Sequence, residues 1–441
     1  MLLNKVLNLF HNQFHKIYEQ SRIIKSLDLI ILFVILTTFI ISTFLSSDTI
    51  GCFCIITFLL TIARIITNPN DTLKFEKFEL FLLIYLIIII ISVSGSTLLA
   101  HSFKGFLKTL VYLSFYFSIV HHLKYNKNNI QLIIMTIAGC VTLESFISIG
   151  QNFSSVAEIS GWQDTSRLNP EDIMTRVYGT LKPLNPNLFG GYLISAICSL
   201  FGMASLCFND YKNKRGIFFT ILSLISIVAV FLTGCRGAYV ALLAMFIAIF
   251  AISVKFFWEN YKNIYLSILG FCFAGGIALL MIFSSIRARV FSIFAMRSDS
   301  SNSFRFNVYQ SAVQMFKDNW LLGIGVGNQN FREIYGLYMK SGFDALSAYN
   351  IYLEIAVESG IFALIAFIAF LSKLFLDGIK FILKSNDHKS IIYASIALIS
   401  IFGVLVHGLV DTVFFRPQIQ IVFWTMAAIL SNQLYSKNSL D

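Results

Sequence analysis

The chain has 441 residues, of which 57% are hydrophobic and only 13% are charged, and its formal net charge is +10. Soluble globular proteins carry about 25% charged residues, so this composition cannot cover a water-soluble surface of this size. It excludes a cytosolic enzyme, a disordered chain and a secreted disulfide scaffold. With a mean hydropathy of +0.76, the chain is predicted to be an integral membrane protein.

Long apolar blocks distinguish spanning helices from the strands of a membrane β-barrel. A spanning α-helix needs about 20 mostly apolar residues, whereas a barrel strand alternates polar and apolar residues over about ten. The run from Leu80 to Val93 is apolar on all sides. The predicted fold class is therefore an all-α polytopic membrane protein with about twelve transmembrane helices. The predicted spans are 27–46, 50–66, 78–95, 103–122, 130–150, 188–208, 216–233, 237–257, 264–285, 351–373, 391–411 and 418–435.

Lysine and arginine in the short loops predict the orientation, because cytoplasmic loops are enriched in both. They occur before the first span and after every second span, for example at Arg22, Arg64 and Lys124. The opposite short loops hold only Arg236 and Arg416. Both termini are therefore predicted to lie in the cytoplasm, with the chain in the plasma (inner) membrane. The positive net charge is interpreted as this topology signal and not as a nucleic-acid-binding surface.

The predicted orientation divides the chain into five parts. Residues 1–26 carry apolar side chains at helical spacing and are predicted to form a cytoplasmic amphipathic helix, with an ordinary solvated lead-in as the alternative. Residues 27–285 hold nine spans and an outer loop at 151–187, 286–350 form a large periplasmic loop between the ninth and tenth spans, 351–435 hold three spans, and 436–441 form a cytoplasmic tail. The seven cysteines show no metal-ligand spacing, so no metal and no other cofactor is predicted.

Two outer features combine basic residues with turns. Residues 167–193 carry Arg176 and an Asn-Pro-Asn turn that ends at Asn187, which is typical of either substrate contact or a structural re-entry loop. The sequence LTGCRGAYVAL places Arg236 at the membrane edge with no acidic residue within ten positions. An arginine there either snorkels to the interface or binds phosphate or carboxylate oxygens. Anion contact is the preferred interpretation.

The large outer segment is predicted to be electropositive. Four arginines, of which Arg305 is the last, lie within fewer than twenty residues and face a single nearby acid, Asp299. An anionic ligand or lipid headgroups would satisfy this charge. The glycine run from Gly323 to Gly327 is expected to form a tight turn, because it lacks the preceding strand of a nucleotide-binding loop.

Two pairs of ionisable residues are four apart, a spacing that places side chains on one helix face. Glu354 and Glu358 are expected either to join a helix–helix ion pair or to hold a proton. His407 and Asp411, followed by Arg416 in HGLVDTVFFRP, are expected to form an oriented base. The alternative for His407 is a structural role, as a histidine at a helix interface whose hydrogen bonds are satisfied.

Taken together, these motifs resemble a known superfamily. Along the chain come an Asn-Pro-Asn turn, then the motif LTxxRGA at the predicted membrane edge, and then a large outer loop. This loop carries an arginine about twenty residues before GIGVGNQNF. This order resembles the O-antigen ligase and polymerase superfamily, the WaaL- and Wzy-type membrane glycosyltransferases, over roughly residues 180–365. Within it, FRFNVYQSAVQMF, GIGVGNQNFREIYGLY and LSAYNIYLEIAVESG resemble the IctB family, which is found in cyanobacteria and labelled a bicarbonate transporter.

The superfamily resemblance implies a GT-C-like, metal-independent glycosyltransferase that takes a glycan from a polyprenyl diphosphate at the outer membrane face. By position, Arg236 and Arg305 correspond to the arginines that clamp the diphosphate. The family's general base is a histidine, followed by a small polar residue, nine further residues and a glycine. Here Tyr349 and Asn350 precede Gly360 at that spacing, so a tyrosine stands where the histidine belongs. A tyrosine with an ordinary pKa near 10 is a poor base at neutral pH.

Three functional hypotheses follow from these features. The preferred one is handling of a polyprenyl-diphosphate-linked glycan for cell-envelope polysaccharide. The second is transport of a small anion such as bicarbonate, although no repeated halves are found. The third is a non-catalytic protein of envelope assembly. The candidate catalytic residues are His407, Asp411 and Tyr349, and the candidate substrate-binding residues are Arg236, Arg305, Arg416, Arg176, Asn187 and Asn350.

Overall fold

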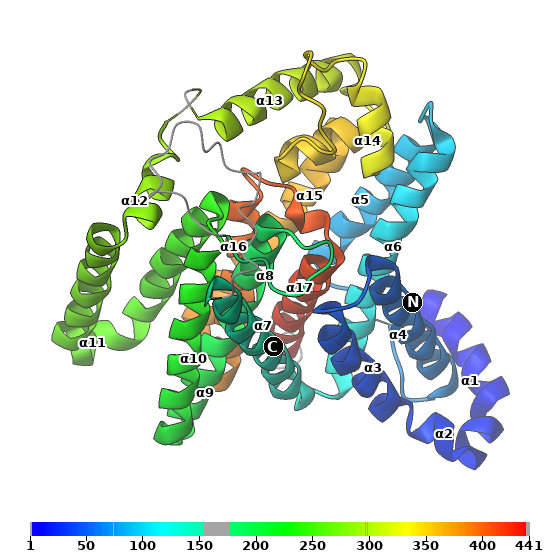
Figure 1. Ribbon diagram of the computed structural model, residues 1–441. Coiled ribbons are helices and arrows are strands. Elements are labelled where there is room, and N and C mark those ends of the chain that lie inside the picture. The colour runs from blue at the N-terminus through cyan, green and yellow to red at the C-terminus, as the bar shows by residue number, and fades with distance from the viewer. Residues whose placement is uncertain (1, 74, 154–175, 296, 298, 438–441) are drawn as a thin grey trace.

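The computed structural model describes residues 2–73, 75–153, 176–295, 297 and 299–437, and the regular elements of this part of the chain are all helical (Figure 1). The helices are α1 Leu2–Gln20, α2 Arg22–Lys25, α3 Leu27–Ser42, α4 Ser47–Thr67, α5 Lys77–Ser94, α6 Leu99–Tyr125, α7 Asn129–Phe153, α8 Pro186–Ala196, α9 Cys198–Asn209, α10 Asn213–Leu232, α11 Arg236–Ile282, α12 Ser284–Phe291, α13 Ser300–Asp318, α14 Asn328–Tyr335, α15 Ile351–Lys384, α16 His388–His407, the 3-10 turn η4 Val413–Phe415 and α17 Pro417–Lys437.

Within the described residues, nine helical stretches are long and apolar enough to cross a membrane, so the chain is a multi-pass membrane protein. About twelve spans were predicted, and each predicted segment overlaps a helix. The count differs because α11, with 47 residues, merges two predicted spans across a break at Tyr261. In addition, α3 has only 16 residues, and the glutamines and asparagine of α17 lower its hydropathy. The predicted orientation stays a prediction.

Helix α17 forms the centre of the bundle, where Figure 1 shows it among the other helices. Every residue from Ile419 to Leu430 is buried, and the helix packs against α6, α16 and α8. Some of its polar side chains bond inside the bundle: Trp424 Nε1 donates to Gln420 Oε1 at 2.5 Å, and Gln418 Nε2 donates to the Lys182 carbonyl oxygen at 2.7 Å. Because α17 contacts protein on all sides, it does not need the uniformly apolar surface of a lipid-facing helix.

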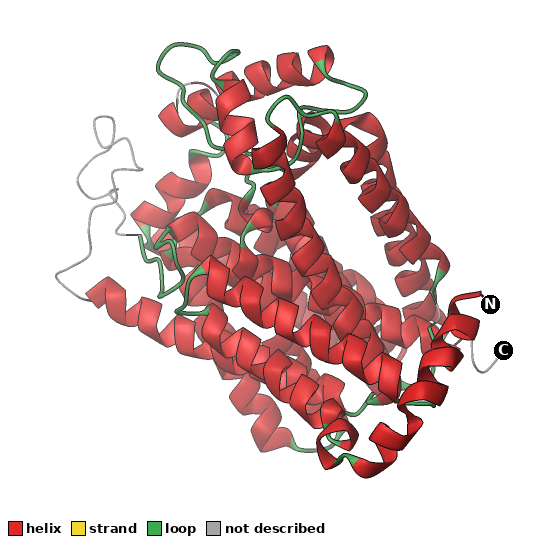
Figure 2. Ribbon diagram, turned by 90° about the vertical axis from the view of Figure 1, so that its right-hand side faces the viewer, coloured by secondary structure: helices red, strands yellow, loops and turns green. Residues whose placement is uncertain are grey.

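A layer of short helices, α12 to α14, covers one end of the bundle (Figures 1 and 2). It corresponds to the predicted loop 286–350 and has an apolar core of its own. That core includes Val308, Ala312, Met315, Ile324, Phe331, Tyr335, Ala345, Ala348 and Val357. Since α13 belongs to this core and also lies above the start of α11, the layer sets the position of Arg305 over the bundle.

The glycine run joins this layer to α15. Gly323, Gly325 and Gly327 have φ values of +72°, +100° and +116°, which glycine adopts without strain, so the predicted tight turn is present. The N–H of Gly325 donates to the carbonyl of Glu358 at 2.9 Å, and the N–H of Gly327 donates to the carboxylate of Glu358 at 2.9 Å. These two hydrogen bonds hold the glycine run against the second helical turn of α15.

The expected helix–helix ion pair of Glu354 and Glu358 is wrong. Glu354 accepts a hydrogen bond from the N–H of Ala348, as Glu358 does from the glycine turn. Neither carboxylate forms an ion pair among the described residues. Backbone N–H groups are their partners because the outer layer folds back against the first two turns of α15.

The two ends of the chain and the first outer loop are described in part. Residues 1–26 contain α1 and α2, and His11 Nε2 of α1 lies 2.8 Å from the Ile65 carbonyl oxygen of α4. Their position relative to a membrane stays a prediction. Of the predicted outer loop 151–187, residues 154–175 lie outside the described residues, as do 438–441 of the predicted tail.

Candidate functional site

The turn between α10 and α11 organises the candidate site. Gly234 has a φ of +59°, which lets the chain reverse within three residues. The carbonyl oxygen of Thr233 accepts a hydrogen bond from Arg176 Nε at 2.8 Å, and that of Gly234 accepts one from Arg289 Nε at 3.0 Å. Two arginines from distant parts of the chain are thereby held beside the first residue of α11, Arg236.

Arg236 is held from the opposite side by the segment that leads into α13. Its Nη1 lies 3.0 Å from Asp299 Oδ1 and 3.2 Å from the carbonyl and the hydroxyl oxygen of Ser292. Asp299 also caps α13, because Oδ1 accepts a hydrogen bond from the N–H of Asn302 at 2.9 Å. The acid that pairs with Arg236 therefore also fixes the start of the helix that carries Arg305.

Among the described residues, Arg305 has no close hydrogen-bond partner for its side-chain donors. Its Nη2 lies 3.8 Å from Asp411 Oδ2, and its Nη1 lies 3.5 Å from Ser301 Oγ. Its Nε is buried and has no hydrogen-bond partner among the described residues. The guanidinium carbon lies 5.8 Å from the centre of the Tyr349 ring. Because the Nη groups of Arg305 make only these long contacts and Arg305 lines the pocket described next, the guanidinium is placed to receive acceptor oxygens from a ligand.

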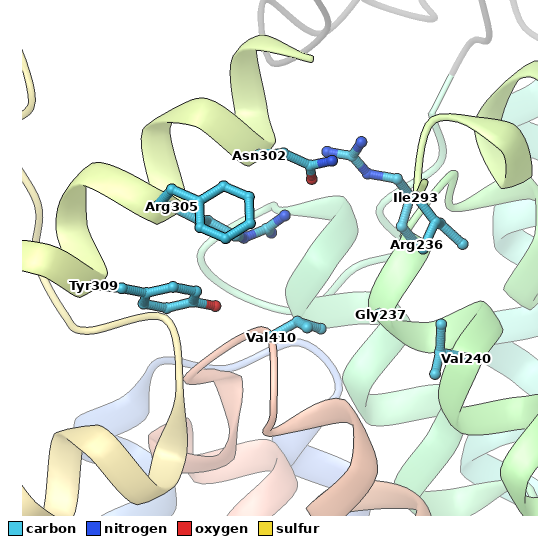
Figure 3. Close-up of a pocket in the computed structure, with 9 residues that line it drawn as sticks. Arg236, Gly237, Val240, Ile293, Asn302, Arg305, Tyr309 and Val410 are labelled. Atoms are coloured by element: carbon cyan, nitrogen blue, oxygen red, sulfur yellow. The ribbon is translucent and has the colours of Figure 1, made fainter. Parts of the chain in front are cut away.

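Arg236 and Arg305 line one pocket of about 190 Å³ (Figure 3). Its polar wall comes from α13, which contributes Asn302 and Tyr309 beside Arg305. The remaining lining residues are Gly237, Val240, Ile293, Phe306 and Val410. The pocket therefore places cationic and apolar surfaces side by side, a combination that suits an anion attached to an apolar group.

Positive charge exceeds negative charge around this pocket. Among the described residues, the charged side chains in or beside the pocket wall include Arg176, Arg236, Arg289, Arg305, Asp299 and Asp411. The exposed Arg297 also lies here, with its guanidinium carbon 5.6 Å from the ring centre of the lining residue Phe306. Burial, and then the charges of neighbouring arginines, lower the pKa of Arg289 to about 10, which still leaves it protonated at neutral pH. The five arginines outnumber the two aspartates. This excess of positive charge favours an anionic ligand.

His407 and Asp411 lie beside the site with different partners. Helix α16 ends at His407, so the expected common helix face is not formed. His407 is only 2% exposed, and its Nε2 lies 3.5 Å from Cys235 Sγ. Asp411 Oδ1 accepts a hydrogen bond from the N–H of Thr412 at 2.7 Å, while Oδ2 faces Arg305. Of the two, the carboxylate is the group next to the pocket arginines.

Of the other predicted substrate-binding residues, Asn187 and Asn350 have structural partners. Asn187 Oδ1 accepts a hydrogen bond from Arg176 Nη2 at 2.6 Å. Asn350 caps α15, since its Oδ1 accepts a hydrogen bond from the N–H of Leu353 at 2.9 Å. Arg416 is exposed and is not among the residues that line the pocket. The structure thus brings Arg176, with Asn187 behind it, to the site.

Sequence reasoning named no site role for several residues that the structure places here. Asn302 and Tyr309 are three and four residues from Arg305 on α13, so helical spacing could have found them. Asp299 has the sequence position of a helix cap. For Cys235, the only sequence feature that could have predicted a role in the site is its position directly before Arg236. Burial raises the pKa of its thiol, but the hydrogen bond and charge of His407 outweigh burial and leave this pKa below its ordinary value.

Residues 221–368 match the model of a protein family described as O-antigen ligase (Wzy_C). The match covers about a third of the 441 residues and runs from α10 into α15, so it includes Arg236, Arg289 and Arg305. The O-antigen ligase resemblance is confirmed for this segment, whereas membership of the IctB family stays a prediction. A search of curated proteins found no match for the chain.

Proposed function

We propose that this multi-pass membrane protein, whose residues 221–368 match the O-antigen ligase family, binds a polyprenyl-diphosphate-linked glycan and transfers the glycan to an acceptor hydroxyl. The observation that carries the proposal is the pocket between Arg236 and Arg305, around which arginines outnumber acidic residues. A diphosphate that joins a lipid to a sugar has one negative charge on each phosphate. Guanidinium groups bind such oxygens in pairs.

The apolar lining supports a lipid-linked ligand over a free anion. Val240 of α11 and Val410 of the loop after α16 lie on the bundle side of the pocket. They are suited to the first isoprenyl unit, while the diphosphate lies between the arginines. A small hydrated anion would leave this apolar surface without a partner.

The proposed reaction exchanges one bond at the anomeric carbon of the glycan. The acceptor oxygen bonds to that carbon while its bond to the diphosphate breaks. The departing diphosphate gains one negative charge, which Arg236 and Arg305 stabilise in the transition state. The proton of the acceptor hydroxyl passes to Asp411, whose Oδ2 lies 3.8 Å from Arg305 Nη2. The Nε2 of His407 faces Cys235 Sγ at 3.5 Å, so His407 supports the turn at Cys235 and does not take this proton.

Tyr349 is not the base in this scheme. Burial, and then the charge of Asp411, raise the pKa of its phenol above the ordinary value, so the hydroxyl stays protonated at neutral pH. Its ring packs near the Arg305 guanidinium, a contact that phenylalanine preserves. We therefore expect Tyr349→Phe to keep the rate of glycan transfer within about threefold of the unmodified protein, with an unchanged pH profile.

This prediction is checked by measuring glycan transfer in membranes between about pH 6 and about pH 9. Tyr338→Phe, a change of the same kind in the outer layer, is the matched control. A loss of about a hundredfold in Tyr349→Phe alone, or a shift in the alkaline limb of its profile, would assign the base to the tyrosine.

A binding measurement tests the diphosphate site itself. The purified protein is titrated calorimetrically with a short-chain polyprenyl diphosphate, the corresponding monophosphate and the free polyprenol. We expect the diphosphate to bind about tenfold or more tightly than the monophosphate, with an affinity that falls as salt is added. Equal affinity for all three lipids would overturn the proposal.

A deletion experiment separates the alternatives in cells. Loss of the protein should cause a polyprenyl-diphosphate-linked glycan to accumulate, because its consumption stops. An unchanged glycan pool together with reduced uptake of labelled inorganic carbon would support bicarbonate transport. Loss of envelope polysaccharide in the deletion strain, restored in full by a chain with both Arg236 and Arg305 replaced, would support the accessory role.

A further inference from the structure

A second cavity of about 520 Å³ lies between α9, α11 and α16. Its walls are three helical stripes within residues 198–209, 249–257 and 388–399. The stripe on α11 lies in the middle of that helix, which begins at the site residue Arg236, and the stripe on α16 lies in its first part, whereas His407 ends it. The cavity is therefore separate from the arginine pocket and shares none of its lining residues.

The cavity is a groove with a closed floor and an exposed rim. At the floor, a side chain added at Gly202 would collide with Ile396, so α9 and α16 approach closely there. Along the rim, Phe208 and Phe257 are exposed. Apart from a few serines and the residues at one end, the lining is apolar. An apolar groove that is exposed on a membrane-spanning helix bundle faces lipid and not water.

The length of the groove matches one leaflet of a bilayer. The stripe on α9 runs from Cys198 to Asn209, which at 1.5 Å per residue corresponds to roughly 16 Å along the helix. The hydrocarbon core of a bilayer is about 30 Å thick, so the groove extends through about half of it. This is the depth that one acyl chain occupies in its own leaflet.

One end of the groove has the side chains of a membrane–water interface. Asn209 ends α9 and His388 begins α16 at this end, and on α11 Trp258 and Tyr261 are 44% and 55% exposed. Tryptophan and tyrosine are enriched at the headgroup level of membranes. Lys262 Nζ lies 4.8 Å from the centre of the Trp258 ring, which adds a cation at this level.

A second lysine strengthens the positive charge at the same end. Lys255 precedes the lining residue Phe256, and its Nζ donates to the carbonyl oxygens of Ile382 at 2.7 Å and Ser385 at 3.1 Å. These bonds hold the cation beside the mouth of the groove. A lipid phosphate at this position would meet charges of opposite sign from Lys255 and Lys262.

We propose that this groove binds one acyl chain of an anionic membrane phospholipid, whose phosphate lies beside Lys255 and Lys262. The lipid chain contacts α9, α11 and α16 and fixes the position of α11 relative to α16. Because α11 begins at Arg236 and α16 ends at His407, the bound lipid supports the arginine site from its far side. This proposal rests on the groove alone and stands whether or not the protein transfers glycans.

The test counts phospholipids that stay bound after purification in mild detergent. Native mass spectrometry is applied to the full chain after incubation with phosphatidylglycerol. The groove is filled by Ser395→Phe on α16, or by Ser205→Trp at the exposed rim on α9 if the first variant does not fold. The hydroxyl of Ser395 is buried without a hydrogen-bond partner among the described residues, so replacing it removes no bond. Ser395→Ala is the matched control.

We expect the unmodified chain and Ser395→Ala to retain one phosphatidylglycerol, and the filled variants to retain it about tenfold less often. Added phosphatidylglycerol should raise the melting temperature of the first two proteins and leave the filled variants unchanged. Equal retention in a folded filled variant would overturn the proposal, since the lipid would then be bound elsewhere. Retention of a polyprenyl lipid in the groove would overturn it as well.

Discussion

Replacing Arg305 with alanine should reduce glycan transfer by about a hundredfold or more, the loss found when one donor to a developing oxyanion is removed. The reason is that Arg305 lines the pocket and its two Nη groups make only long contacts among the described residues, 3.8 Å to Asp411 and 3.5 Å to Ser301. These Nη groups are thus available to a ligand. The measurement is the initial rate of transfer from a polyprenyl-diphosphate-linked glycan in membranes with matched protein levels.

Arg332→Ala is the matched control for this prediction. Arg332 lies in the same outer layer and pairs with Asp344, and both side chains are more than half exposed. Its removal lowers the charge of the layer by the same amount and should leave transfer nearly unchanged. Equal losses in the two variants would show that overall charge matters and that Arg305 has no specific contact with the diphosphate. Glycan transfer at the normal rate in Arg305→Ala would show that Arg305 is not part of the functional site.

Replacing Gly360 with alanine should lower the free energy of unfolding by roughly 3 kcal/mol or more, because the strained backbone alone costs about 1–3 kcal/mol for a residue with a side chain. Gly360 interrupts α15 with φ +80° and ψ 177°, and an added Cβ would collide with the carbonyl oxygen of Leu321. At this break the N–H of Ile361 donates to the Trp320 carbonyl oxygen at 2.9 Å. The substitution should therefore detach the outer layer from α15, which thermal unfolding in detergent would detect.

Gly276→Ala provides the comparison. Gly276 lies in the exposed second half of α11, and no atom lies within 4 Å of an added Cβ. Alanine favours a helix over glycine by about 1 kcal/mol, so this variant should be as stable as the unmodified protein or slightly more stable. A Gly360→Ala protein that unfolds at the same temperature as Gly276→Ala would show that α15 can run through this position unbroken.

Much of the helical bundle could be predicted because apolar blocks are a local property of the chain. The exceptions have identifiable physical causes. The two spans predicted at 237–257 and 264–285 are present as the two halves of α11, which carries a single label although its backbone is broken at Tyr261, within the polar stretch 258–263. Helix α17 has too many amide side chains for a lipid-facing span, and it tolerates them because the bundle surrounds it.

Part of the candidate site could also be predicted. Arg236 and Arg305 were singled out because an arginine at a membrane edge and an arginine-rich outer segment are unusual in an apolar chain, and both line the same pocket. His407 and Asp411 were expected to act as one unit, yet α16 ends between them. Arg289 could not be assigned from its neighbours in the chain, because its partner is the carbonyl oxygen of Gly234.

Composition and order of residues alone establish a helical membrane protein with a few unusual charges, because insertion of a helix depends on the side chains within that helix. The identity of the partners of those charges comes from the folded chain. Arg236 pairs with Asp299, His407 meets Cys235, and Arg305 of α13 lines the same pocket as Arg236 of α11. Each of these contacts joins residues that are remote in the chain, so it depends on packing between helices and cannot be read from local spacing.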